Sequence, residues 1–324
     1  MFLKKNLIFF FILFFISFLV FDINKKEEQL SISFYSWENS FNQKEVKEKL
    51  YIKVLDIAYS TRLELVKTNL LTKPKDFVPV IYITNETMKN VDYTLVSSAI
   101  LETLKKFEFS EVQIDCDWSD SSASNYFNLL KDLKAKLSKT ISATIRLHQI
   151  KYYYKTGIPP VDYGVLMYYN MSNIGDFDTK NSILDNDIAK QYHYNFDIYN
   201  LKLKLALPLY SQAIQFRNKK SLSIFEGIKK DDFDSDFLEI SPNYFKVLNS
   251  KYFKGRYIYK DDIFRFEDSI KSEIKIALDD FLKLSKNRFD EVIFYTLKYK
   301  EKYDLENLIK GNIWFLEFFF CGFL

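Results

Sequence analysis

Short apolar runs typical of strands alternate with segments of helical periodicity from residue 31 onward. Longer segments with an apolar stripe at helical spacing predict helices over residues 92–107, 121–138 and 268–287. Weaker helical patterns fall at 43–49, 183–192 and 242–250. Eight runs rich in Val, Ile, Tyr and Phe are predicted to be strands: 32–37, 50–57, 78–84, 112–118, 141–148, 163–170, 203–210 and 291–299.

This alternation predicts βαβ units around a parallel sheet. Eight strands in a chain of 324 residues fit a (β/α)8 TIM barrel. A doubly wound open sheet is the alternative, but the sequence lacks the Gly-rich first turn of that fold. Residues 211–267, between the seventh and eighth strands, are too many for a simple loop. We predict an insertion with some helix there, on the face where such barrels build their sites.

The first residues combine a short positive region with an apolar run. Lys4 and Lys5 precede residues 7–21, and Asp22 ends the run. This pattern predicts a signal peptide over residues 1–22 and a polar linker over 23–30, before a barrel over 31–324. The run is shorter than the roughly 20 residues of a spanning helix, and no small-residue cleavage site follows it. An uncleaved signal anchor that attaches the chain to a membrane, or a buried apolar helix, are the alternatives.

An exported protein of the periplasm or cell envelope is therefore expected. At the other end, residues 304–324 finish in the apolar sequence NIWFLEFFFCGFL. A barrel needs its final helix, which favours a last helix that packs on the barrel. A membrane-seeking end is the other interpretation of this tail.

The charges are mixed in sign along the chain, which carries a formal net charge of +3 and no basic block. This excludes nucleic acid as an implied partner. With seven glycines, the chain has no Gly-rich phosphate loop or dinucleotide fingerprint. Its two cysteines and two histidines show no metal-ligand spacing, so we predict no metal and no cofactor. Cys116 is expected to be a buried, small apolar residue.

The strand over residues 112–118 alternates polar and apolar positions. Its polar positions, Gln113, Asp115 and Asp117, are expected to face the barrel interior near the top, where the active sites of such barrels form. Two carboxylates at this spacing lie roughly 6–7 Å apart at Cβ, which is compatible with the carboxylate pair of a glycosidase. The apolar positions, expected to face the helices, are Val112, Ile114, Cys116 and Trp118.

The next strand repeats this alternation with Thr144, Arg146 and His148, and Arg146 is the natural counter-charge for the aspartates. Carboxylates, cations, amides and aromatic rings together suit a sugar, because rings stack on pyranose faces and polar groups bond hydroxyls. A buried ion network that only joins two strands is the simpler interpretation. The other strand ends contribute Trp37, Glu38, Asp56, Tyr168, Asn170, Tyr210 and Gln212.

The stretch IDCDW resembles the signature strand of the chitinase-like, family-18 glycoside hydrolases. Aligned on its Trp, Asp115 and Asp117 fall on the second and third aspartates of that signature. In chain order FYSW, MYYN and LPLY resemble the family's first, sixth and seventh strand segments. The longer stretches IDCDWSDSSASNYFNLLKDLK, ISATIRLHQIKY and TGIPPVDYGVLMYYNMSNIG are more similar to a group of uncharacterised exported bacterial proteins with a glycosidase-like barrel.

The sequence departs from the family pattern at three positions. Val112 stands at the first aspartate, Ser119 at the proton-donating glutamate and Asn170 at the sixth-strand aspartate. The resemblance implies that the glutamate protonates the leaving oxygen, while an aspartate positions the acetamido group of the substrate as nucleophile. A serine cannot donate that proton at neutral pH, so the ordinary chitinase mechanism is not supported.

Three functions are compatible with these residues. The first is a glycoside hydrolase with a rearranged acid, in which Asp117 is the acid or base, Asp115 is its partner, and Arg146 and His148 tune their pKa values. The second is a catalytically inactive barrel that binds a glycan or serves an envelope assembly. In the third, these residues only hold two strands together. For the hydrolase, the second carboxylate is one of three candidates, Asp120, Asp56 or Glu38.

Overall fold

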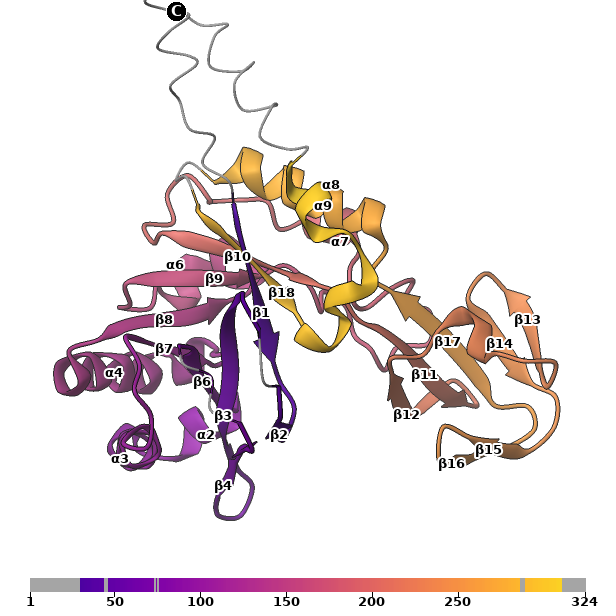
Figure 1. Cartoon of the computed structure of the whole chain (residues 1–324), viewed down its shortest axis with the longest axis horizontal. Helices are drawn as coiled ribbons and strands as arrows, with labels where there is room; N and C mark the ends of the chain where they lie inside the picture. The colour runs from indigo at the N-terminus through magenta and orange to yellow at the C-terminus, as the bar shows by residue number, and fades with distance from the viewer. Residues whose placement is uncertain (1–29, 44–45, 73, 75, 286–288, 311–324) are drawn as a thin grey trace, which may run out of the picture.

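The computed structural model describes residues 30–43, 46–72, 74, 76–285 and 289–310 (Figure 1). The predicted signal or anchor, nearly all of the predicted linker, Cys321 and the apolar end of the tail lie outside these residues. Within the described part of the chain, every helix is too short or too polar to span a bilayer.

The centre of the molecule is a closed barrel of eight parallel strands, and it confirms the predicted TIM barrel. All eight predicted strands are present, and β1 closes the barrel by pairing with both β3 and β18. In chain order the barrel strands are β1 (Ser31–Ser36), β3 (Lys49–Tyr59), β6 (Val78–Ile83), β7 (Glu111–Asp115), β8 (Thr140–Ile145), β9 (Tyr163–Met167), β10 (Leu203–Pro208) and β18 (Glu291–Tyr295).

Several strands are shorter than predicted at the end that carries the candidate residues. β7 ends at Asp115 rather than at 118, and β8 ends at Ile145 rather than at 148. The residues beyond these ends leave the ladder because the chain turns into a helix. β4 (Leu63–Lys67) returns antiparallel to the long strand β3, and β2 (Ser40–Phe41) pairs with β5 (Asn69–Leu70).

The three strongly periodic segments form the predicted helices α3 (Tyr93–Leu104), α4 (Asp120–Leu137) and α8 (Lys271–Leu284). Two weak predictions were wrong: the described residues of 43–49 contain no helix, and 242–250 contains the strand β14, because sheet pairing overrides a short helical pattern. The shorter helices are α2 (Asn85–Asn90), α5 (Leu147–Lys151), α6 (Tyr153–Thr156), α7 (Asn186–Lys190) and α9 (Leu305–Lys310), with the 3-10 helix η2 (Leu297–Lys302).

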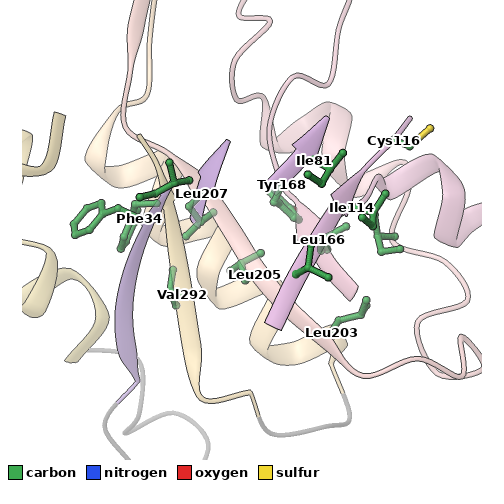
Figure 2. Close-up of a cluster of buried hydrophobic side chains, with 14 of the residues drawn as sticks. Phe34, Ile81, Ile114, Cys116, Leu166, Tyr168, Leu203, Leu205, Leu207 and Val292 are labelled. Carbon is green, nitrogen blue, oxygen red and sulfur yellow. The ribbon is translucent and has the colours of Figure 1, made fainter. Parts of the chain in front are cut away.

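Two apolar layers pack against the barrel wall, one on its outer side and one on its inner side. The outer layer packs between strands and helices and includes Val112, Ile114, Cys116 and Trp118, as predicted. Figure 2 shows this layer, with Ile114 beside residues of neighbouring strands. The inner layer consists mainly of rings and branched side chains, so the barrel is a packed core and not a pore. Its members are Tyr35, Tyr51, Val78, Val80, Tyr163, Val165, Met167, Tyr169, Ala206 and Ile293.

An ionic network closes the barrel floor, at the N-terminal ends of the strands. The buried carboxylate of Glu291 accepts from Lys204 Nζ at 2.5 Å and from the Tyr51 hydroxyl at 3.1 Å. Glu111 accepts from Lys49 Nζ at 3.1 Å and from the Tyr163 hydroxyl. The floor is therefore sealed by paired charges, and the mouth is left at the C-terminal ends of the strands.

The insertion between β10 and β18 is an antiparallel sheet with its own phenylalanine-rich core. Little helix was found where some was predicted: the described insertion contains only η1 (Lys230–Asp232). The insertion extends sideways from the barrel (Figure 1). Its strands are, in spatial order, β12 (Lys220–Glu226), β11 (Ser211–Arg217), β17 (Ile263–Asp268), β14 (Tyr244–Val247) and β13 (Phe237–Ser241), with a separate hairpin of β15 (Lys251–Phe253) and β16 (Arg256–Ile258).

Candidate functional site at the barrel mouth

Asp115 is the last residue of β7 and lies just inside the mouth. Its side chain faces β8, where the Thr144 hydroxyl donates to Oδ1 at 2.6 Å, and the residue is only 6% exposed. Burial, and after it the charge of Asp117, raise the pKa of Asp115 to about 6. Asp115 therefore stays protonated up to a higher pH than a solvated aspartate does.

Asp117 and Arg146 form a bidentate pair above Asp115. Arg146 Nε donates to Oδ1 of Asp117 at 2.7 Å, and Nη2 donates to Oδ2 at 3.1 Å. A third bond from Nη1 to the carbonyl oxygen of Tyr169, at 3.3 Å, fixes the guanidinium against β9. The Asp117 side chain is 51% exposed and that of Arg146 only 19%. The pair thus presents carboxylate edges to solvent from a position fixed by the barrel.

Aromatic rings form one wall of the mouth. Trp37, after β1, contacts Tyr82 and Tyr295 at centroid distances of 6.0 Å each. Tyr295 continues the wall to Tyr169 at 5.5 Å and to Tyr210 at 5.6 Å. The sequence prediction missed Tyr82, Tyr169 and Tyr295. Extending the strand alternation on β6, β9 and β18 would have placed all three on the inner face.

Asp56 also lies at this end of the barrel, beside Lys53. The register of β3 shifts between Lys53 and Leu55, and Lys53 Nζ donates to Asp56 Oδ2 at 2.8 Å. Lys53 Nζ also lies 5.7 Å from the centre of the Trp37 ring. Among the described residues, nothing donates to the buried Oδ1 of Asp56. A buried acceptor without a partner is costly, and because this oxygen is shielded from solvent a ligand does not reach it in this conformation.

Asn170 and Tyr210 form a second polar pair near the wall. The Tyr210 hydroxyl donates to Asn170 Oδ1 at 2.5 Å. Asn170 is exposed and has a φ of 56°, a left-handed conformation that Asn tolerates better than most residues.

Three residues predicted at strand ends lie elsewhere. His148 lies on α5, exposed, because β8 ends three residues before it. Tyr168 belongs to the outer layer (Figure 2) and faces the helices, since Met167 and Tyr169 take the inner positions. Its hydroxyl lies 2.8 Å from His193 Nε2. Gln212 is buried on β11, where its Nε2 donates to Glu267 of the insertion at 2.7 Å. These three predictions failed because strand ends were placed too far along the chain or because a side chain was assigned to the wrong face of its strand.

The position where the resemblance places the acid is occupied by the start of α4. Ser119 Oγ accepts from Asn85 Nδ2 at 3.2 Å, and the Ser119 amide donates to Ser122 Oγ at 3.0 Å. Asp120, the first residue of α4, is exposed. Glu38 is exposed as well and lies 3.9 Å from Lys298. In the described ranges, no three His, Cys, Asp or Glu side chains are grouped so that they could hold a metal ion.

No family model matches this chain, and no curated protein matches it in sequence. Solved structures do resemble it. The spore cortex-lytic enzyme SleL of Bacillus cereus is 12% identical with a TM-score of 0.52, and the likeness covers 87% of this chain and 74% of that one. A chitinase from Chromobacterium violaceum is 9% identical with a TM-score of 0.53, over 88% of this chain and 99% of the other. At such identities the likeness shows the fold alone, and it confirms the predicted likeness to chitinase-like barrels.

Proposed function

We propose that this chain is an exported glycan-binding barrel whose mouth holds a sugar polymer without the acid of the family-18 reaction. The observation that carries the proposal is the exposed Asp117–Arg146 pair beside the aromatic wall. Rings that stack on sugar faces and a fixed carboxylate–guanidinium pair that bonds hydroxyls are the usual elements of a sugar site.

The same geometry argues against hydrolysis by the family's route. Both Asp117 oxygens accept from Arg146, so proton donation by Asp117 would break a charge-assisted pair. Asp115 holds a proton more readily, but it is buried beneath the pair and bonded to Thr144. Ser119 is engaged at the start of α4. None of these groups is free to protonate a leaving oxygen above the mouth.

The proposed ligand is an extracytoplasmic glycan. The neighbours' names describe a spore cortex-lytic enzyme and a chitinase, which supports a glycan of an envelope or extracellular matrix. The positive and apolar residues 4–21 support export, with the segment either cleaved or kept as a membrane anchor.

A glycan array with the full chain, followed by a reducing-sugar assay on every bound glycan, tests the proposal. We expect binding without turnover, and loss of about tenfold or more in affinity for Asp117→Asn and for Trp37→Ala, since each removes a central contact. Glu64→Gln, at an exposed position on β4, is the matched control and should bind normally. Absence of binding to any glycan would contradict the proposal.

Hydrolysis with Asp120 as a relocated acid is the second candidate function. The exposure of Asp120, one residue after Ser119, favours it. In that case the reducing-sugar assay shows turnover, and Asp120→Asn abolishes turnover while the glycan still binds. Turnover that survives in Asp120→Asn would exclude this acid.

A further inference from the structure

An open cavity of about 410 Å³ lies between the insertion and the segment that follows β18. Its insertion side comes from the end of β12 and from β16, and its barrel side comes from Lys298 and Tyr299 of η2. This volume falls in the range of small-ligand sites, which starts at about 300 Å³. The cavity is therefore large enough for a sugar unit.

Tyr295, the last residue of β18, connects the mouth along the chain to the segment that lines the cavity. Tyr295 contacts Trp37 of the aromatic wall and is followed directly by the turn that carries Tyr299. Burial raises the pKa of Tyr295, and the charges of Glu226 and Asp115 raise it further. The pKa of Tyr295 is therefore raised by one carboxylate of the cavity, Glu226, and by one of the mouth, Asp115.

One wall of the cavity is apolar and rigid. Tyr299 donates its hydroxyl to Glu226 Oε1 at 2.9 Å, which fixes its ring at the edge of the insertion. Gly227 permits this approach: its φ is 74°, and a Cβ there would lie 2.8 Å from the Tyr299 hydroxyl oxygen. Ile224 and Phe225 complete the apolar surface.

The other wall is cationic. Three cations and one carboxylate line the cavity: Lys254, Arg256, Lys298 and Glu226. Lys254 forms an ion pair with Asp232 at 2.7 Å, whereas the carboxylate of Glu38 lies 3.9 Å from Lys298. Within the described ranges no carboxylate forms an ion pair with Arg256, whose guanidinium lies 5.1 Å from the centre of the Phe225 ring. An anion that enters the cavity meets the Arg256 guanidinium and the Lys298 ammonium, with the carboxylate of Glu226 in the same lining.

From this arrangement we infer that the cavity is a subsite for an acidic sugar, and that the glycan bound at the mouth carries carboxylate groups. A carboxylate matches the fork of the Arg256 guanidinium, and Lys298 adds a second positive charge. The sugar ring packs on Tyr299 and the neighbouring apolar side chains. Glu226 is the one carboxylate in this lining, against the three cations, and it accepts a hydrogen bond from the Tyr299 hydroxyl. This inference rests on the proposed glycan-binding function.

The test is calorimetric titration of the full chain with three carboxylate-bearing glycans, each beside its carboxyl-reduced counterpart: a hyaluronan hexasaccharide, a hexagalacturonate and a glycan strand containing muramic acid. We expect at least one acidic form to bind about tenfold more tightly than its reduced form, as suits a charged hydrogen bond. Raising the salt from about 0.05 to 0.5 M should reduce this ratio, because salt screens exposed charges.

Two variants locate the preference in the cavity. In Arg256→Gln and in Lys298→Gln the ratio of the two dissociation constants should fall toward one. Arg62→Gln is the control and should keep the full ratio. Arg62 is an exposed arginine on the β3–β4 hairpin, distant in sequence from the residues that line the cavity. Circular dichroism melts verify that each variant folds.

The outcomes separate the two proposals. Equal affinity for acidic and reduced forms, or a full preference retained in Arg256→Gln, overturns the acidic subsite and leaves glycan binding at the mouth intact. If neither the acidic, the reduced nor any neutral glycan of the array binds, the proposed function fails and the subsite fails with it. Loss of binding to both forms in Asp117→Asn would support the connection between the mouth and the cavity.

Discussion

Asp115 is a carboxyl group that the folded protein makes harder to ionise. Its pKa is about 6 in the barrel mouth, against about 3.9 in an unfolded chain. When the pKa of a carboxyl rises on folding, its contribution to the free energy of unfolding is fully present below the pKa of the unfolded chain, near pH 4. That contribution is then lost as the pH rises through the folded value, near 6.

Asp115→Asn should therefore make the protein more stable at pH 7 by about 1–3 kcal/mol and leave its stability near pH 4 almost unchanged. The Thr144 hydroxyl can still donate to the amide oxygen of the variant. Urea unfolding of both proteins at pH 4 and pH 7 measures the difference. Equal destabilisation at both pH values would show that the effect of the substitution does not depend on ionisation, and would contradict a raised pKa of Asp115 as its cause.

The polar centre of the mouth could be predicted at the residue level because strand alternation assigns faces without knowledge of the loops. Asp115, Asp117 and Arg146 lie where the pattern of β7 and β8 placed them. His148 and Tyr168 lie elsewhere, for two different reasons. The strand β8 ends before His148, and Tyr168 lies on the outer face because the alternation of β9 has the opposite phase. Lys53 could not have been found from the pattern alone, because the irregularity in β3 shifts its register.

Among the elements, the helices α2, α3 and α4 depend on one another through Asn125. Its Oδ1 accepts from the backbone amide of Tyr93 at the start of α3. Its Nδ2 donates to the carbonyl oxygens of Met88 and Val91 at the end of α2, at 2.9 and 2.7 Å. One side chain of α4 thus satisfies the free backbone groups of two other helices, which would otherwise lack partners.

Asn125→Ala should lower the free energy of unfolding by about 2–3 kcal/mol, because three hydrogen bonds to helix ends are lost together. Thermal unfolding measures the change. Asn128→Ala, on the exposed side of the same helix, is the control and should be neutral or slightly stabilising, since Ala has the higher helix propensity. A similar small effect from both substitutions would show that water replaces Asn125 at these ends.

The helices and strands that were predicted correctly are those whose apolar pattern lies within a short stretch of sequence. The long helices and barrel strands carry a repeated apolar pattern, and the structure has all of them. The insertion is mostly β-sheet because its strands are stabilised by partners distant in sequence, such as Ser211 opposite Asp268. A pattern within a few residues cannot encode such a pairing.

Across the whole molecule, Arg265 joins the insertion to the barrel. It is fully buried and bonds Glu267 Oε1 at 2.8 Å. It also donates to backbone carbonyl oxygens of the loop after β9, those of Ile174 at 2.9 Å and of Asp176. Phe177 of this loop packs against Phe216 of the insertion sheet at a centroid distance of 5.1 Å. The barrel loop and the sheet therefore share one buried polar centre.

Arg265→Met should destabilise the protein by about 3–5 kcal/mol, since it leaves the buried Glu267 carboxylate without its counter-charge. The measurement is hydrogen exchange of the loop at residues 172–180 together with thermal unfolding. Adding Glu267→Gln should recover part of the loss, because the unpaired charge is then removed. No recovery in the double variant would indicate that the bonds to the loop, and not the ion pair, determine the stability.

The closure of the barrel through β1 also affects the order in which the chain can fold. β1 pairs with β18, so the strand at Ser31–Ser36 waits for a partner about 260 residues later, Ser31 opposite Glu291. During synthesis the edges of β1 and β10 have unpaired amides and carbonyls until that last strand arrives. The closing pair has a far larger sequence separation than the pairs of consecutive barrel strands, and open strand edges are the sites where two chains can pair with each other. The last barrel strand in the chain is therefore also the one that removes the last open edges of the ring.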